Sequence, residues 1–414
     1  MNDNVANACP LTALSDSFRL SNQQLEQTLN LARATAPVTY LPDIGYWAVS
    51  KYDDVKSILG DTENFSAEIT LQPLVPFTDE VVELLKERKF SPRPTLSNNT
   101  RDDHARIRRS TQIAFAPRRM KSLEPYIRQL VDESVSRFIG DKRADIVSQL
   151  VYELPALVLF RLLGVPPEDV THIKRWADDR LLLTFGKLDG HRQLEAAKNL
   201  ADYWDYCIDL VQKKMVNPGD DLPSDMLATR AEDESALSIE DINNVVFGLL
   251  LAGHETTTNA SANAILTLLQ ENGAWATLAE NPDLIPGAVE ELLRFRPSVV
   301  AWRRLARQPV EISGVSIPAG DRVLCFLASA NRDEDKFADS ETFDLQRKDA
   351  RAHIAFGFGD HFCLGAPLAR FELRVILEEL TARLPGLRLV DDQSFAMIET
   401  VQFRGPRALR VEWD

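Results

Sequence analysis

One stretch of the chain constrains the fold more than any other: a helical pattern that runs from Ser238 to Gly273. Ser238 with Asp241 three residues later forms a capping-box pattern at its start, and Asn272-Gly273 ends it. A single helix over roughly 34 residues would be about 50 Å long at 1.5 Å per residue. Because its middle part is mostly apolar, we expect this helix to cross the core of the protein.

The centre of this stretch carries polar residues that a core helix normally avoids. Residues 252–257 read AGHETT, which places the carboxyl group of Glu255 beside the hydroxyl groups of Thr256 and Thr257. Burying a charge costs free energy, and β-branched residues lower helix propensity. A polar helix face is the simpler interpretation, but the apolar flanks argue against it. We therefore expect Glu255 and Thr256 to serve a function inside the protein.

A second stretch delivers one cysteine to the start of another helical pattern. Residues 355–365 read AFGFGDHFCLG, and an amphipathic pattern follows from Leu368 to Leu380. Gly357 and Gly359 allow positive φ angles or a close approach to a flat group. The amides and the dipole of a helix N-terminus favour a thiolate over a thiol at Cys363. Such a thiolate can be a nucleophile or a metal ligand, and a small buried core residue is the remaining alternative.

The composition limits the classes of protein that the chain can belong to. Its 414 residues, with 44% hydrophobic and 26% charged, are ordinary for a soluble globular protein and allow one large enzyme domain. A net charge of −15 argues against a nucleic-acid partner. The four cysteines are scattered, no apolar run approaches the roughly 20 residues of a membrane span, and the start lacks signal-peptide features. We expect a cytoplasmic protein that is not bound to a membrane.

The pattern Phe-Gly-x-Gly-x-His-x-Cys-x-Gly from Phe356 to Gly365 resembles the haem-binding loop of the cytochrome P450 superfamily. Three further motifs resemble the same family in the same order along the chain: His104/Arg108, Glu255-Thr256 and Glu291/Arg294. The resemblance covers nearly the whole chain. In several details, such as Phe403-Arg404-Gly405-Pro406, it is similar to the haem domain of bacterial self-sufficient P450 monooxygenases, which are fused to a flavin and iron–sulfur reductase.

The resemblance implies a haem b cofactor whose iron is bound by the thiolate of Cys363. His104, Arg108 and Arg304 match family positions that contact the haem propionates. The full set of implied haem contacts is His104, Arg108, Arg304, His361, Phe356, Gly357, Gly365 and Ala252. Glu255 and Thr256 would pass protons to bound dioxygen.

Two other sets of residues follow from the resemblance. Glu291 and Arg294 would join Arg347 in a buried cluster that shapes the haem pocket. An apolar substrate pocket would be lined by Leu250, Leu251, Val299, Val300, Trp302 and Ile398. A small apolar organic substrate is therefore expected.

The implied fold is mainly α with small β-sheets (α+β), the cytochrome P450 fold, a triangular helical prism around a buried haem. We expect a single domain over residues 1–414, with a β-rich part at about 35–70, a helical core at about 104–300 and the haem loop and C-terminal part at about 301–414. Val38–Leu41 and Tyr46–Val49 are predicted strands, and Val310–Ile317 with Arg322–Leu327 a predicted hairpin or small sheet.

The implied activity is monooxygenation. One oxygen atom of O2 would enter the substrate by hydroxylation or O-dealkylation, with electrons from NAD(P)H through a flavin/iron–sulfur reductase, fused or separate. Three alternatives remain open: a non-catalytic haem–thiolate sensor or gas carrier, a peroxide-driven peroxygenase, and a haem-free enzyme with Cys363 as nucleophile.

Overall fold

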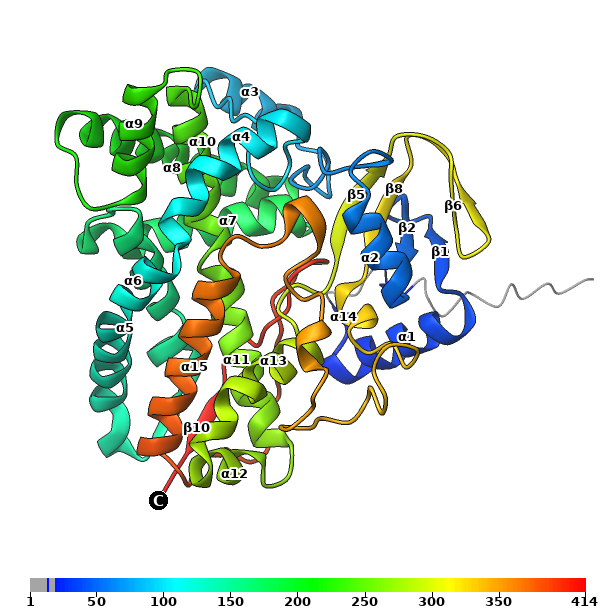
Figure 1. The fold of residues 1–414 in the computed structure, drawn as a ribbon, viewed down its shortest axis with the longest axis vertical. Coiled ribbons are helices and arrows are strands. Elements are labelled where there is room, and N and C mark those ends of the chain that lie inside the picture. Colours follow the sequence, from blue (N-terminus) through cyan, green and yellow to red (C-terminus); the bar gives the residue numbers. More distant parts are fainter. Residues whose placement is uncertain (1–12, 15–18) are drawn as a thin grey trace, which may run out of the picture.

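Helices make up most of the chain, and the larger β-sheet lies at one side of them (Figure 1). The computed structural model describes residues 13–14 and 19–414, so Cys9 lies outside the described residues. The predicted class, mainly α with small sheets, is confirmed.

The larger sheet has five strands in the order β1-β2-β8-β5-β3. They are β1 (Val38–Leu41), β2 (Tyr46–Val49), β8 (Arg322–Cys325), β5 (Trp302–Ala306) and β3 (Phe65–Ser66). β2 pairs with β8 in parallel, and β8 pairs with β5 in antiparallel. This sheet joins the N-terminal part of the chain to the segment that follows residue 300, far away in sequence.

Residues 310–317 and 322–327 are predicted to form a hairpin or small sheet together, but they do not pair with each other. The hairpin is instead formed by β6 (Val310–Ile312) and β7 (Val315–Ile317), which turn at Ser313-Gly314 with φ angles of 47° and 76°. β8 pairs with β2 and β5 and not with this hairpin, because Val323, Leu324 and Cys325 are all buried. Three consecutive buried positions need protein on both faces, which the centre of the larger sheet provides.

Most of the helices lie to one side of this sheet and form the bulk of the molecule (Figure 1). They are α1 (Asn22–Thr35), α2 (Tyr52–Gly60), α3 (Asp79–Glu87), α4 (Arg101–Thr111), α5 (Pro117–Phe138), α6 (Leu154–Leu162), α7 (Val170–Phe185), α8 (Gly190–Val216), α9 (Leu222–Glu232), α10 (Ile239–Ala252), α11 (Glu255–Gln270), α12 (Ala274–Glu280), α13 (Ile285–Phe295), α14 (Leu327–Ala330) and α15 (Ala366–Arg383). The segment near the C-terminus takes part in a three-stranded sheet. Its strands are, in order, β4 (Arg143–Asp145), β10 (Arg410–Glu412) and β9 (Arg388–Leu389).

The predicted single long helix is two helices, α10 and α11, which meet at Gly253 and His254. The hydroxyl groups of Thr256 and Thr257 donate to the carbonyls of Ala252 and Gly253 at 2.8 and 3.3 Å. These are the carbonyls that backbone amides would bond in a continuous helix, so the side chains replace part of the ladder. Two hydroxyl residues in a row therefore interrupt the helix as well as fill its centre.

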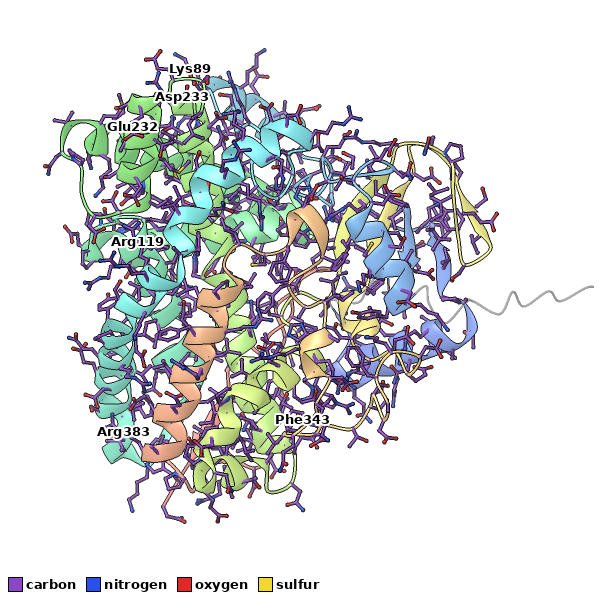
Figure 2. The ribbon with its side chains drawn as sticks, viewed as in Figure 1. Lys89, Arg119, Glu232, Asp233, Phe343 and Arg383 are labelled. Atoms are coloured by element: carbon purple, nitrogen blue, oxygen red, sulfur yellow. The ribbon has the colours of Figure 1, made fainter. Side chains whose placement is uncertain are left out.

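The central helices carry the two stretches singled out in the sequence. α11 packs against α6, α13 and α15, and α15 begins directly after the cysteine loop. Figure 2 shows Arg383 at the far end of α15, while Lys89, Glu232 and Asp233 lie together at the opposite end of the molecule. In the described part of the chain, no helix is both long enough and apolar enough to cross a membrane.

Candidate active site

The loop before α15 is shaped by backbone hydrogen bonds and two glycines. The Cys363 amide donates to the Phe356 carbonyl at 2.9 Å, which closes the loop into a tight hairpin-like turn. Gly357 and Gly359 have φ angles of 75° and 73°, which L-residues rarely adopt. At Gly359 a Cβ would also lie only 3.0 Å from the Cα of Gly60, so the loop can cross the end of α2 only with glycine there.

Cys363 lies in the wall of a large internal cavity, with about 1770 Å³ of empty space counted out to its opening. The thiol has accessible surface because it faces this cavity, while protein atoms surround it on its other sides. Other walls come from α7, the junction of α10 and α11, β5 and residues 95–97. The cysteine is therefore inside the fold yet open to a bound group.

The surroundings of Cys363 act on its charge in opposite directions. Burial raises the pKa of the Cys363 thiol, whereas hydrogen bonds from the Gly365 and Ala366 amides and the positive charge of Arg108 lower it. These amides at the start of α15 direct partial positive charge at the sulfur. A cation next to the sulfur would complete the stabilisation of a thiolate.

Four basic side chains gather beside the cysteine loop: His104, Arg108, Arg304 and His361. The rings of His104 and His361 are 4.2 Å apart between centroids, and Nη2 of Arg108 donates to the Phe362 carbonyl at 2.7 Å. Burial, followed by Arg304, His104 and Arg108, lowers the pKa of His361 to about 3. Nε2 of His104 is buried without a hydrogen-bond partner among the described residues. The carboxylate of Asp360 acts on His104 and Arg108, but the basic side chains outnumber it, so the group can accept further negative charge.

These features fit haem. A single cysteine supplies one soft ligand to iron, the basic group can receive two propionate carboxylates, and glycines let the loop lie close to a flat ring. One cysteine beside a basic group suits a metal that arrives within a larger cofactor. Phe356, Gly357, Gly365 and Ala252 also lie in the cavity wall.

Arg304, rather than its neighbour Arg303, is the arginine of this pair that lines the cavity. Nη1 of Arg304 donates to the carbonyl of Arg303 at 2.9 Å. Arg303 points to the other side of β5, where it donates to the Gln72 carbonyl at 2.6 Å. Alternation along a strand produces this difference.

Thr256 and Glu255 occupy different environments at the junction of α10 and α11. Both line the cavity, but Glu255 is largely buried, with Oε1 2.7 Å from Nζ of Lys174 and 3.1 Å from Nε2 of His254. Burial alone would raise the pKa of Glu255, but Lys174 and then His254 hold it well below its usual range. Glu255 is therefore ionised in a buried ion pair.

Asp178 completes this buried group of charges. Burial and the nearby Glu255 carboxylate raise the pKa of Asp178 to about 7, against the opposing charge of Lys174. Its Oδ2 accepts a hydrogen bond from the Tyr152 hydroxyl at 2.8 Å. Sequence reasoning missed Lys174 and Asp178. Their spacing of four residues on a helix with buried apolar neighbours was the available signal.

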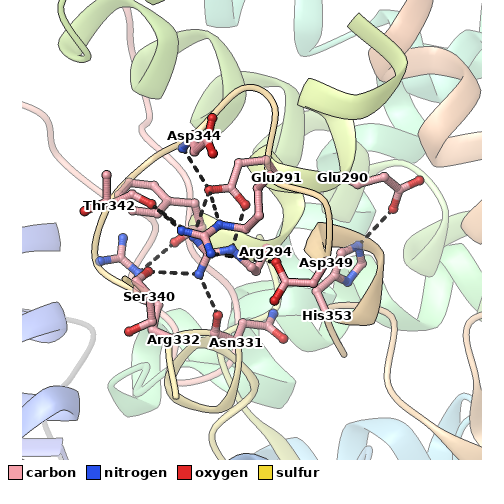
Figure 3. Close-up of polar contacts among 12 residues, drawn as sticks. Glu290, Glu291, Arg294, Asn331, Arg332, Ser340, Thr342, Asp344, Asp349 and His353 are labelled. Carbon is pink, nitrogen blue, oxygen red and sulfur yellow. Dashed lines mark hydrogen bonds and ion pairs between the residues drawn. The ribbon is translucent and has the colours of Figure 1, made fainter. Parts of the chain in front are cut away.

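The predicted structural cluster is assembled beneath α13 (Figure 3). Arg294 binds Glu291 through two hydrogen bonds, Nε to Oε2 at 2.6 Å and Nη2 to Oε1 at 2.8 Å. Nε of Arg347 donates to Oε1 of Glu291 at 3.2 Å. Arg294 also donates to the carbonyls of Asn331 and Ser340, so the cluster ties α13 to the segment that precedes the cysteine loop.

Half of the predicted substrate pocket faces the cavity. Leu251, Val299 and Trp302 line it, whereas Leu250 packs in the main core and Val300 in the core behind the larger sheet. Their placement follows from geometry, because adjacent residues point about 100° apart on a helix and to opposite faces of extended chain. Ile398 packs against the cluster around Phe403 and is not part of the wall.

Further residues line the cavity that the sequence did not single out. Most of them are apolar, and they also include one arginine and several hydroxyl residues; examples are Leu181, Phe185, Val245, Leu249, Arg180 and Thr95. The apolar residues among them on α7 and α10 share only a helical period with many core residues, so the sequence could not separate them from the core.

Known proteins resemble the chain in both sequence and structure. The family model "Cytochrome P450" matches residues 177–383. The putative cytochrome P450 YjiB of Bacillus subtilis is 36% identical over 388 residues, which cover 92% of this chain and 91% of that protein.

Two solved structures are also similar. Cytochrome P450 CREJ, in complex with (4-ethylphenyl) dihydrogen phosphate, superposes with a TM-score of 0.92 at 38% identity over 94% of this chain and 97% of that chain. An intact type IV self-sufficient cytochrome P450 monooxygenase superposes with a TM-score of 0.91 at 35% identity, over 94% of this chain and 51% of that one.

These matches agree with the geometry of the cysteine loop, the group of basic residues and the cavity between them. They confirm the predicted fold and the haem cofactor. The chain belongs to the cytochrome P450 family and is a haem-binding monooxygenase.

Proposed function

We propose that this enzyme inserts one oxygen atom of O2 into a small organic substrate held in the cavity, by hydroxylation or O-dealkylation. The observation that carries the proposal is that Cys363 and Thr256 lie in the walls of one cavity whose lining is otherwise mainly apolar. The cavity therefore holds the iron ligand Cys363, the hydroxyl group of Thr256 and enough room for an organic molecule.

Haem would be held by Cys363 at the iron and by His104, Arg108, Arg304 and His361 at its carboxylates. When bound, it supplies the iron that activates dioxygen, with the thiolate adding electron density. Arg108 also holds the Phe362 carbonyl, next to the cysteine, so the same side chain would link the propionate contact to the loop.

Proton delivery would fall to residues at the junction of α10 and α11. The hydroxyl of Thr256 donates to the Ala252 carbonyl and can turn to donate into the cavity instead. Asp178, with a pKa of about 7, can hold a proton beside the ionised Glu255. Glu255 would accept that proton on a carboxylate oxygen and pass it through water to the Thr256 hydroxyl.

The apolar walls would position the substrate and exclude water. Phe185, Trp302 and Phe403 form mutual ring contacts, with centroids 4.9 to 6.5 Å apart, at one side of the cavity. The complex of cytochrome P450 CREJ with (4-ethylphenyl) dihydrogen phosphate supports a substrate with a small aryl or alkyl body.

The electrons would come from NAD(P)H through flavin and iron–sulfur centres. The likeness to an intact self-sufficient monooxygenase over about half of its length supports a reductase of this kind, fused or separate. The cytoplasm, where NAD(P)H is available, fits this proposal.

The test is turnover of the haem-loaded protein with NAD(P)H, a flavin/iron–sulfur reductase and ¹⁸O-labelled dioxygen. We expect one labelled oxygen atom in the hydroxylated product. For O-dealkylation we expect it in the released aldehyde, trapped before it exchanges with water, and not in the dealkylated alcohol. Reduction without any product would favour a sensor or gas carrier. Product that forms only with hydrogen peroxide, and without label from dioxygen, would favour a peroxygenase.

A further inference from the structure

Arg180 on α7 is a buried arginine without an acidic partner among the described residues. Its side chain lies against α10, where Nη1 donates to the carbonyl of Phe247 and Cζ is 3.6 Å from the centroid of the Phe247 ring. No Asp or Glu in the described part of the chain forms an ion pair with it, and the residue is 7% exposed. Burial lowers the pKa of Arg180, as expected for a charge that lacks a counter-ion.

A buried guanidinium of this kind is costly unless something compensates for its charge. The Phe247 carbonyl and ring and the neighbouring Tyr203 hydroxyl compensate only in part, because none of them carries a full negative charge. Elsewhere in the interior, Arg294 is paired with Glu291, and Arg332 with Glu341. Arg303 also lacks a carboxylate, but it donates to the Gln72 carbonyl and does not line the cavity.

Arg180 lies in the cavity wall, away from the group of basic residues at the cysteine loop. It comes from α7 and contacts α10, whereas Arg108 and Arg304 come from α4 and β5. Those two arginines have the haem carboxylates as partners in the proposed arrangement. Arg180 is the cation of the cavity that this arrangement leaves without an anion.

The hydroxyl group of Thr95, from the segment between α3 and α4, lies beside this turn of α10. A Cβ built at Gly248 would be 3.6 Å from Oγ1 of Thr95, and Gly248 directly follows the Phe247 whose carbonyl binds Arg180. Thr95, Gly248 and Arg180 all line the cavity. The other nearby lining residues, Leu181, Val245 and Leu249, are apolar and leave this as a local polar site.

We propose that Arg180, assisted by Thr95, binds an anionic group of the substrate, either a carboxylate or a phosphate monoester. This inference rests on the proposed function and narrows its substrate class from small organic molecules to those with an apolar body and an anionic end. A guanidinium has five N–H donors in a planar fork that matches both anions, and one donor at Nη1 is used by Phe247. Arg180 is then a residue that determines specificity, and the apolar end of the substrate is the end left free to react.

The test is a set of ligand titrations on the ferric haem-loaded protein, followed by the shift of the haem absorption. Three ligands share a para-alkylphenyl body and end in a carboxylate, a phosphate monoester or a neutral hydroxymethyl group. Arg180→Gln removes the charge, Arg180→Lys retains it, and Arg175→Gln is the matched control because Arg175 is exposed on the same helix.

We expect the wild-type protein to bind at least one of the two anions more tightly than the neutral ligand, and the tighter one identifies the anion. Arg180→Gln should weaken that anion by about 30-fold or more and leave the neutral ligand within about threefold. Arg180→Lys should fall between the wild type and Arg180→Gln, and Arg175→Gln should match the wild type. Equal binding of charged and neutral ligands by the wild type would overturn the inference. An equal loss for all three ligands in Arg180→Gln would also overturn it, by showing a purely structural role.

Thr95→Val gives a second route if Arg180→Gln does not yield folded protein. It removes one hydroxyl at nearly constant volume, and we expect about a fivefold loss for the anion alone. No selective loss would contradict the site. Because binding is measured without turnover, the titrations can be interpreted even if the protein does not carry out monooxygenation. Turnover without any preference for anions would overturn only the anion site and not the proposed function.

Discussion

At the scale of residues, the buried charges at Lys174, Asp178 and Glu255 set the chemistry of the α10–α11 junction. One cation faces two carboxyl groups, so one carboxyl can ionise fully and the other keeps a proton until about neutral pH. Such a pair separates a proton holder from a proton acceptor within one buried group.

The raised pKa of Asp178 predicts a pH dependence of stability. Its pKa rises from 3.8 to about 7 on folding, so the folded state binds an extra proton between these values. This residue therefore makes the protein less stable as the pH rises from about 4 to 7. In Asp178→Asn the free energy of unfolding should therefore fall less steeply as the pH rises. Urea unfolding at pH 5 and pH 7 would measure this difference. Asp283→Asn, at an exposed position, should leave the slope unchanged, and an unchanged slope in Asp178→Asn would refute the assignment.

Thr256 gives a second prediction at this scale. Its hydroxyl lies in the cavity wall and hydrogen-bonds only the Ala252 carbonyl among the described residues. Thr256→Ala should keep substrate binding and lower the fraction of electrons that reach product by about tenfold, the rest appearing as peroxide. The ratio of product to NAD(P)H consumed is the measurement. Full coupling in the variant would mean that Thr256 takes no part in proton delivery.

At the scale of elements, the junction between α10 and α11 depends on contact with α6. A Cβ at Gly253 would lie 2.9 Å from Cδ2 of Leu159, too close for either side chain to stay in place. The glycine thus allows α6 to lie against the point where the helix opens.

Gly253→Ala should therefore destabilise the protein by about 1–3 kcal/mol through overpacking. Gly287→Ala on α13 is the control, because its Cβ would have room and alanine favours a helix. The measurement is the free energy of unfolding, including the double variant Gly253→Ala/Leu159→Ala. Strictly additive effects in the double variant would contradict direct contact as the cause.

The Glu291–Arg294–Arg347 cluster acts between elements (Figure 3). Because Glu291 and Arg294 are fully buried, removing Arg347 leaves a buried carboxylate with one cation in place of two. Arg347→Met should cost about 2–4 kcal/mol of stability and loosen the segment that leads to the cysteine loop. Thermal unfolding and the haem content after purification would measure both. Arg351→Met, at a mostly exposed site, serves as control, and equal effects of the two changes would exclude a special role for the cluster.

At the scale of the whole molecule, the sequence predicted what depends on residues close together in the chain. The strands β1 and β2 begin and end where predicted, and the cysteine loop has its signature within 11 residues. The predicted fold follows from this loop with three ordered motifs.

Features that depend on distant contacts could not be predicted. The partner of β8, the pairing of Lys174 with Glu255 and the orientation of Leu250 away from the cavity are each decided by packing between segments. The break at Gly253 involves hydroxyl bonding, and the close approach that favours glycine there comes from Leu159, about 90 residues earlier in the chain. In the sequence, Arg180 is like any charged residue of a helix. Its lack of a carboxylate partner among the described residues depends on how α7 packs against α10.

The central claim is that Cys363 binds the haem iron, and the absorption spectrum of the reduced, CO-bound protein tests it most directly. The wild type should show the red-shifted band of thiolate-ligated haem, and Cys207→Ala and Cys325→Ala should keep it because these cysteines are buried in the core and the sheet. Cys363→Ala should lose the band. A Cys363→Ala protein that retains both haem and this band would contradict the account.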